Sequence, residues 1–142
     1  MDLLLQVWVF KKKVEIHRQF WKSAFAVEIV RVGRYRARFA SSQSEVLAAQ
    51  ALRYQCFNLL NKAELDVDDF DTICRHVLIE SLETKKLICC YRILSFENGK
   101  NISNSYSAQF YDLKSIENYP KPMIEVGRFC MDPEVNDASV II

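Results

Sequence analysis

The sequence lacks the features of a membrane-spanning, secreted or zinc-binding protein. The apolar run at its amino terminus is far shorter than the roughly 20 residues that a spanning helix needs. Basic residues follow that run, whereas in a signal peptide they precede it. The five cysteines form an odd set, and no two of them have the two-to-four-residue gap typical of a zinc site. We therefore expect reduced thiols in a cytoplasmic protein, with no metal.

Internal repeats, low-complexity tracts and RNA-binding motifs are also missing, so we expect one domain and no nucleic-acid partner. A chain of 142 residues, half of them hydrophobic, buries roughly two-thirds of its unfolded surface. Residues 11–38 hold nine basic and two acidic side chains. This basic stretch can attract an acidic carrier protein or anionic lipid headgroups, or it can be an ordinary solvated surface.

The periodicity of the sequence predicts an α/β fold. Strands are expected at residues 35–40, 74–80, 87–95 and 123–131, where β-branched and aromatic residues are frequent. Ser42 and Glu45 have the spacing of a capping box, which predicts a helix from near Gln43 to Leu60. Asn98 and Gly99 predict a turn, and residues 107–118 predict a short helix or helical turn.

Several charged residues stand where a core is expected. Glu125 and Arg128 lie in the last strand, and Arg53 lies on the apolar stripe of the helix. Arg53 can be a snorkelling side chain at the edge of that stripe. Glu125 can simply form an ion pair that ties strand to helix. The acidic run at residues 64–71 is typical of a solvated loop.

Taken in order, four segments resemble a known family: 52–57 (LRYQCF), 66–71 (DVDDFD), 91–94 (YRIL) and 124–130 (IEVGRFC). They resemble the bacterial acyltransferases that make ornithine lipids and, more distantly, the acyl-homoserine-lactone synthases, both of the GNAT superfamily. The resemblance runs from about Gly33 to Pro133. It implies a mixed, mostly antiparallel sheet flanked by helices at residues 33–142, preceded by a basic and apolar extension at residues 1–32.

The resemblance also implies roles for individual residues. Glu125 is expected to be the catalytic base, acting directly or through water, with Arg128 as the second catalytic residue. Gly127 is expected to form a backbone bulge that brings both onto one face and admits the donor's pantetheine arm. Asp66 and Asp69 match the family less well and are expected to face solvent. The expected substrate-binding residues are Arg53, Phe57, Asp68, Asp71 and Arg92.

These roles imply an N-acyltransferase that moves a fatty acyl group to the amine of ornithine or a related amino acid, in ornithine lipid synthesis. The expected donor is a thioester of acyl carrier protein or coenzyme A, and no permanently bound cofactor is expected. A peripheral contact of the amino-terminal apolar run with the inner membrane surface is one alternative. A core segment, or a translated stretch upstream of the true start, is favoured over it. The exposed strand at residues 123–131 also predicts a homodimer formed through that edge.

The family pattern breaks after Pro133. GNAT proteins continue into a loop and helix that hold the donor's phosphates. Here Val135 and Asn136 replace the expected basic residue. We therefore expect only the N-terminal half of the fold. Two alternatives stay open: a truncated, non-catalytic remnant that binds a carrier protein, lipid or partner chain, and an acyl-homoserine-lactone synthase that uses S-adenosylmethionine.

Overall fold

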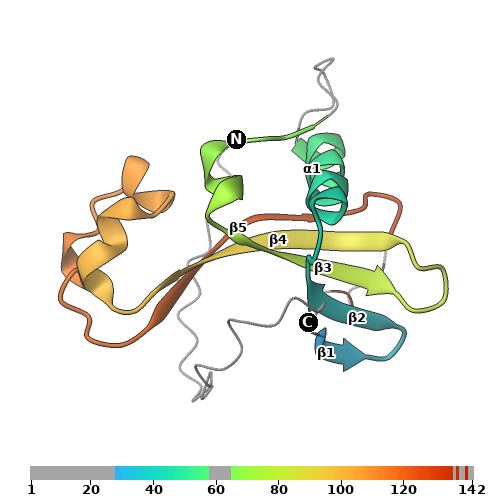
Figure 1. Ribbon diagram of the computed structural model, residues 1–142, viewed down its shortest axis with the longest axis horizontal. Coiled ribbons are helices and arrows are strands. Elements are labelled where there is room, and N and C mark those ends of the chain that lie inside the picture. The colour runs from blue at the N-terminus through green and yellow to red at the C-terminus, as the bar shows by residue number, and fades with distance from the viewer. Residues whose placement is uncertain (1–27, 58–64, 136, 138–139, 141–142) are drawn as a thin grey trace.

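A single antiparallel sheet forms the centre of the molecule (Figure 1). The computed structural model describes residues 28–57, 65–135, 137 and 140. Within that part, the sheet order follows the chain order, and every neighbouring pair of strands is antiparallel. The strands are β1 (Glu28–Val32), β2 (Tyr35–Phe39), β3 (Arg75–Ser81), β4 (Leu87–Phe96) and β5 (Met123–Met131). This sheet confirms the predicted fold class.

β1 was not predicted. It pairs with β2 across a tight turn at Gly33, whose φ of +55° is one that glycine adopts without strain. The sheet therefore begins before the expected domain boundary at residues 32/33. The rest of the expected extension, residues 1–27, lies outside the described part of the chain, as does the alternative of a membrane contact there.

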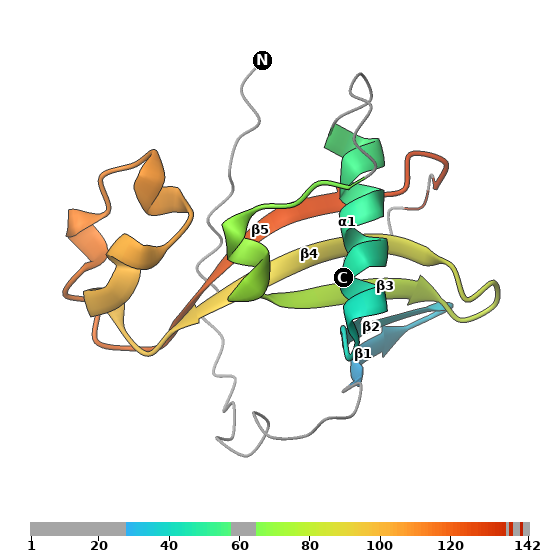
Figure 2. The same cartoon turned by 45° about the horizontal axis from the view of Figure 1, so that its top comes forward.

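The helix α1 (Gln43–Phe57) lies across one face of the sheet (Figure 2). It begins at the predicted residue, where the backbone N–H of Glu45 donates to Ser42 Oγ at 3.3 Å. The reciprocal bond of the capping box goes elsewhere, because Glu45 Oε2 accepts from the Ser41 N–H at 2.6 Å. The expected end of the helix at Leu60 falls outside the described residues.

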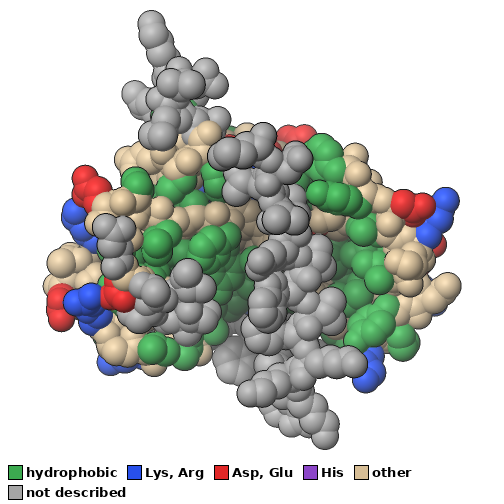
Figure 3. Space-filling model, turned by 180° about the vertical axis from the view of Figure 1, so that it is seen from behind, with side chains coloured by type: hydrophobic (Ala, Val, Ile, Leu, Met, Phe, Trp, Pro, Cys, Tyr) green, Lys and Arg blue, Asp and Glu red, His purple; other side chains and the backbone are tan. Residues whose placement is uncertain are grey.

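The core has a layer on each face of the sheet because the central strands bury both sets of alternating side chains. Leu78, Cys90 and Cys130 pack beneath α1 against Ala49 and Leu52. The other layer gathers around seven buried residues: Tyr35, Ala37, Val77, Ile79, Ile88, Cys89 and Val140. Figure 3 shows hydrophobic side chains gathered on the face that is turned away in Figure 1.

The segment between β4 and β5, residues 97–122, projects from one end of the sheet (Figure 1). It contains three short 3-10 helices, η3 (Gly99–Asn104), η4 (Ser107–Gln109) and η5 (Lys114–Ile116), the last two in place of the helix or helical turn expected at 107–118. Asn98, where a tight turn was expected, caps η3. Gly99 donates its N–H to the Tyr119 carbonyl at 2.8 Å. A Cβ at Gly99 would overlap the Ile116 carbonyl, so only glycine fits there.

None of the helices in the described part of the chain has both the length and the apolar character needed to cross a membrane.

Candidate functional site

Arg53 is the most deeply buried charged side chain of the α1 face, with 1% of its surface exposed. Its Nη1 and Nη2 donate to the two carboxylate oxygens of Asp71 at 2.6 and 2.8 Å. Its Nε donates to Asp66 Oδ2 at 2.9 Å, and Nη2 also reaches the Asp66 backbone carbonyl. The snorkelling interpretation is therefore wrong, because the guanidinium ends in a buried, fully bonded pair rather than in water.

Arg92, from β4, enters the same cluster from the sheet side and is 3% exposed. Its two terminal nitrogens donate to the two oxygens of Asp68 at 2.5 and 2.8 Å. Nη1 also donates to Asp71 Oδ1 at 2.9 Å. Asp71 thus joins the helix arginine to the strand arginine.

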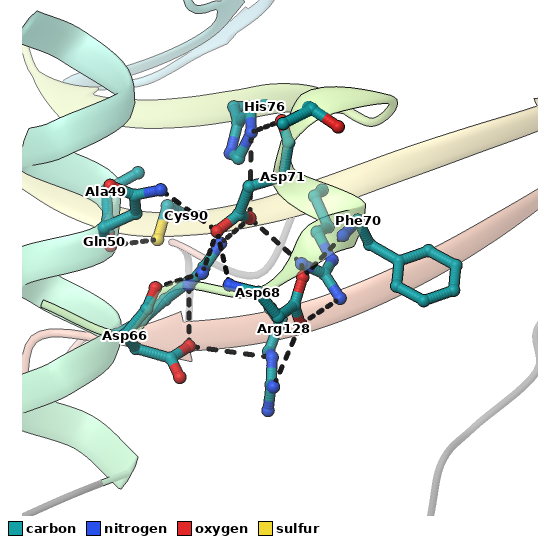
Figure 4. Close-up of polar contacts among 12 residues, drawn as sticks. Ala49, Gln50, Asp66, Asp68, Phe70, Asp71, His76, Cys90 and Arg128 are labelled. Carbon is teal, nitrogen blue, oxygen red and sulfur yellow. Dashed lines mark hydrogen bonds and ion pairs between the residues drawn. The ribbon is translucent and has the colours of Figure 1, made fainter. Parts of the chain in front are cut away.

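Arg128, from β5, completes the cluster (Figure 4). Its Nη2 donates to Asp68 Oδ2 at 3.1 Å, and its Nε lies 3.6 Å from Asp66 Oδ2. Nε is buried and donates no hydrogen bond within the described structure. With 29% of its side chain exposed, Arg128 is the most accessible of the three guanidiniums. We call Arg53, Arg92, Arg128, Asp66, Asp68 and Asp71 the arginine network.

A bulge places Arg128 in this position. Arg92 pairs with Gly127 and Cys90 pairs with Cys130, so two residues of β5 stand opposite one residue of β4. Within this bulge, Arg128 has a positive φ of +53°. The irregularity therefore begins one residue after Gly127, the residue expected to form it. It turns Arg128 onto the face that also carries Arg92.

The aspartates are held by the turn that carries them. Asp68 caps the 3-10 helix η2 (Asp69–Thr72) by accepting the Phe70 N–H at 2.9 Å, and Asp71 accepts the Asp68 N–H at 3.2 Å. Gln50 of α1 donates to Asp71 at 3.0 Å. This closely spaced acidic run is therefore an ordered turn and not a solvated loop, because buried arginines neutralise it.

Asp66 corrects one expectation, since it bonds Arg53 instead of facing solvent. Asp69 is exposed, as expected. The two assignments could not be told apart from the sequence, because both side chains lie in the same acidic run. Only the path of the turn decides which carboxylate reaches α1.

The network shifts the ionisation of its carboxyl groups. Burial would raise the pKa of Asp71, but hydrogen bonds and the charge of Arg53 outweigh it and hold that pKa below its ordinary value. Burial likewise opposes the lowered pKa of Asp68, which hydrogen bonds from Arg92 and Arg128 produce. Asp68 and Asp71 are therefore ionised at neutral pH, where they face the guanidiniums of the network.

Glu125 does not take part in the arginine network. Its Oε2 accepts the Tyr106 N–H at 2.9 Å, and its Oε1 accepts the Ser107 N–H at 2.8 Å. In the described structure no ion pair joins Glu125 to Arg53, Arg92 or Arg128. The alternative in which Glu125 pairs with one of these arginines is therefore wrong, and the carboxylate binds the projecting segment instead.

Phe57 is not brought into the network either. It is the last residue of α1 and is 38% exposed. None of the polar or aromatic contacts described for the network includes it.

Sequence reasoning missed Tyr106. Its ring centroid lies 5.6 Å from the guanidinium carbon of Arg92 and the same distance from that of Arg128. Phe70 meets the ring edge-on at 5.4 Å, and Phe110 lies 5.3 Å away. No sequence signal could have found Tyr106, because its position depends on how the 97–122 segment folds back onto β5.

Residues 52–142 match a family model described as an acetyltransferase (GNAT) domain. The chain belongs to the GNAT family.

Three bacterial relatives of this GNAT chain are each named L-ornithine N(alpha)-acyltransferase. The protein from Brucella abortus (strain 2308) is 29% identical over 132 residues, which cover 81% of this chain and 47% of the relative. The proteins from Agrobacterium fabrum and Rhizobium meliloti are 32% and 31% identical, covering 73% of this chain and 41% and 40% of their own lengths. The chain thus spans less than half the length of the curated relatives it matches. No solved structure matches it significantly.

Four of the five thiols of this GNAT chain have a raised pKa, which makes them poor nucleophiles. Burial raises the pKa of Cys56 and Cys89 to about 12 and that of Cys74 to about 11. A hydrogen bond with Cys90, followed by burial, raises the pKa of Cys130. These thiols are protonated at neutral pH, so the cysteines act as small buried apolar side chains. Among the described residues, no three Cys, His, Asp or Glu side chains are grouped to hold a metal ion.

Proposed function

We propose that the chain acts as an N-acyltransferase that moves a fatty acyl group from a thioester of acyl carrier protein, or of coenzyme A, to the amine of ornithine or a related amino acid. The observation that carries the proposal is the arginine network. Residues from four of the segments that resemble this family converge in it, on one face of a GNAT-type sheet. The common name of the three relatives supports the choice of acceptor.

In this reaction the amine nitrogen attacks the thioester carbonyl, an amide bond forms, the C–S bond breaks, and the thiol leaves with a proton. No covalent enzyme intermediate is needed, so positioning and polarisation of the carbonyl are the main tasks. β5 is an edge of the described sheet, and some of its backbone N–H groups point away from β4. Such an N–H is suited to hold the developing oxyanion.

Arg128 is the residue of the network best placed to meet the acceptor. Its side chain is 29% exposed, whereas Arg53 and Arg92 are almost completely buried and fully engaged. A guanidinium binds a carboxylate through parallel N–H bonds, and an amino-acid acceptor carries such a group. The proposal gives Arg128 the task of holding that carboxylate, and it does not depend on Glu125 as the base.

The proposal places the reaction in the cytoplasm, beside the inner membrane. Five free cysteines agree with a reducing compartment. The excess of basic over acidic residues at positions 11–38 favours contact with an acidic carrier protein. The acyl product is amphipathic, so it would leave toward a lipid surface.

The test is product formation. Purified protein would be incubated with palmitoyl or 3-hydroxyacyl carrier protein and radiolabelled ornithine, and monoacylated ornithine would be sought by thin-layer chromatography. We expect product from the wild type, and at least a tenfold higher KM for ornithine in Arg128→Lys, which cannot form the paired bonds. Lys114→Gln, at an 82% exposed side chain, is the control. Carrier protein that binds without product would support the non-catalytic alternative.

A further inference from the structure

The Glu125 carboxylate attaches the projecting segment to β5 through two backbone hydrogen bonds. Glu125 receives the backbone N–H groups of two consecutive residues, Tyr106 and Ser107, one on each oxygen, at 2.9 and 2.8 Å. Hydrogen bonds of this kind, from an amide to an ionised acceptor, are stronger than those between neutral groups. The site is also shielded, because Ser107 is only 4% exposed.

This attachment determines where the Tyr106 side chain lies. The residue whose N–H is held by Glu125 places its ring over the guanidiniums of Arg92 and Arg128, 5.6 Å from each. Phe70 of η2 makes a T-shaped contact with the ring, and Phe110, which is 63% exposed, lies tilted 5.3 Å from it. Tyr106 thus closes the arginine network where Arg128 approaches the surface.

A residue that removes a proton from a substrate amine must present an oxygen to that amine and then carry the proton. If Glu125 did so, the protonated oxygen would lose part of its capacity to accept an N–H bond, and the hold on Tyr106 would weaken with every turnover. An anchor has no such conflict, because it stays ionised and bonded throughout.

We infer that Glu125 is a positioning residue: it anchors the 97–122 segment to β5 so that Tyr106 covers Arg92 and Arg128, and it is not the proton acceptor of the reaction. Tyr106 then becomes a member of the acceptor site, with its ring forming one wall beside the Arg128 guanidinium. The inference deepens the proposed function and rests on it for its kinetic test alone.

Amide hydrogen exchange tests the anchor without any activity. In the wild type the Tyr106 and Ser107 amides should be protected. Glu125→Ala should raise their exchange rates roughly tenfold or more, since each loses a bond to a charged acceptor. β3 amides should be unchanged. Glu117→Gln, at an exposed carboxylate of the same segment, is the matched control and should change neither amide. Unaltered exchange of both amides in Glu125→Ala would overturn the inference.

The kinetic test separates anchor from base. Glu125→Gln keeps one oxygen acceptor but cannot take up a proton. We expect it to lower kcat/KM by the same factor as Tyr106→Ala and to keep the acidic limb of the wild-type kcat–pH profile. Tyr106→Phe, which keeps the ring, should recover most of the affinity for ornithine that Tyr106→Ala loses. Loss of the acidic limb in Glu125→Gln, with Tyr106 still protected, would show that Glu125 is the base.

The two proposals can fail separately. A chain without activity in which Glu125→Ala exposes the Tyr106 and Ser107 amides would refute the acyltransferase proposal and keep the anchor. An active chain in which Glu125→Ala leaves the exchange of both amides unchanged would keep the acyltransferase proposal and refute the anchor. Thermal midpoints of all variants would be measured first, so that rates are compared on folded protein.

Discussion

Arg53 neutralises buried carboxylates on the α1 face of the sheet. It is 1% exposed and bonds two carboxylates, one of which is itself only 5% exposed. Arg53→Met should lower the free energy of unfolding by about 3–5 kcal/mol, because it leaves Asp71 buried with less compensation. Urea unfolding followed by circular dichroism measures this loss.

The control for Arg53 is Arg36→Met. Arg36 also forms an ion pair, with Glu80 at 3.0 Å, but its side chain is 34% exposed. This substitution should lower the free energy of unfolding by no more than about 1 kcal/mol. Equal losses in the two variants would show that the burial of the network contributes nothing.

The pH dependence of stability follows from the aspartates. The folded-state pKa values of Asp68 and Asp71 both lie below the ordinary value of 3.8. The stabilisation from their ionised forms is therefore complete above that value, and it is lost as the pH falls through it toward the folded-state values. We expect a constant unfolding free energy from pH 7 to about pH 5 and a steep decrease below about pH 4.

Urea midpoints measured across that range would test this. Asp71→Asn should be less stable at pH 7 and should show a shallower acid loss than the wild type. Asp69→Asn, at an exposed neighbour, should keep the wild-type slope. An Asp71→Asn slope equal to the wild type would assign the acid loss to other carboxylates.

At the scale of single residues, the sequence predicted part of the site. Four of the five residues expected to bind substrate, Arg53, Arg92, Asp68 and Asp71, lie in one cluster, and their role in binding stays a prediction. The contacts made by Asp66, Glu125 and Tyr106 were not predicted. Asp66 lies 13 residues from Arg53, Glu125 lies 18 residues from Ser107, and Tyr106 lies 14 and 22 residues from its two arginines. The turns between these partners follow a course that no local pattern encodes.

The edge strand β5 predicts how two copies of the chain associate. Ile124, Val126 and Phe129 are 45%, 38% and 45% exposed along a strand whose outer side pairs with no described strand. We expect two copies to pair through β5, because an exposed apolar edge is a template for another strand. Light scattering at tens of micromolar should show a dimer.

Val126→Lys should shift that dimer to the monomer, since a charged side chain on an edge opposes strand pairing. Leu47→Lys provides the matched control, because Leu47 is 41% exposed but lies on α1. A wild type that stays monomeric would refute pairing through β5.

Among the elements, α1, β2, β3, β4 and β5 were predicted close to their observed bounds. Each has a strong periodic pattern or a cap that depends only on neighbours in the chain. β1 was not recognised because it is short and lies within a basic stretch, and its assignment depends on pairing with β2. The bulge in β5 depends similarly on its register with β4.

For the molecule as a whole, thiol reactivity is a measure of how closely the two core layers are packed. Cys89, Cys90 and Cys130 are at most 4% exposed, and burial raises the pKa of Cys56, Cys74 and Cys89 above the ordinary value of 9.0. At pH 8 the folded chain should react slowly with Ellman's reagent, and in 8 M urea all five thiols should react rapidly. A fast burst of equal size in both conditions would contradict the packing described.

The backbone conformation of Arg128 sets the stability of the protein against its activity. A side chain other than glycine held at a φ of +53° costs about 1 kcal/mol or more. A library at this position, selected only for resistance to heat, should therefore be enriched in glycine and asparagine. The same library selected for acyl transfer should return arginine.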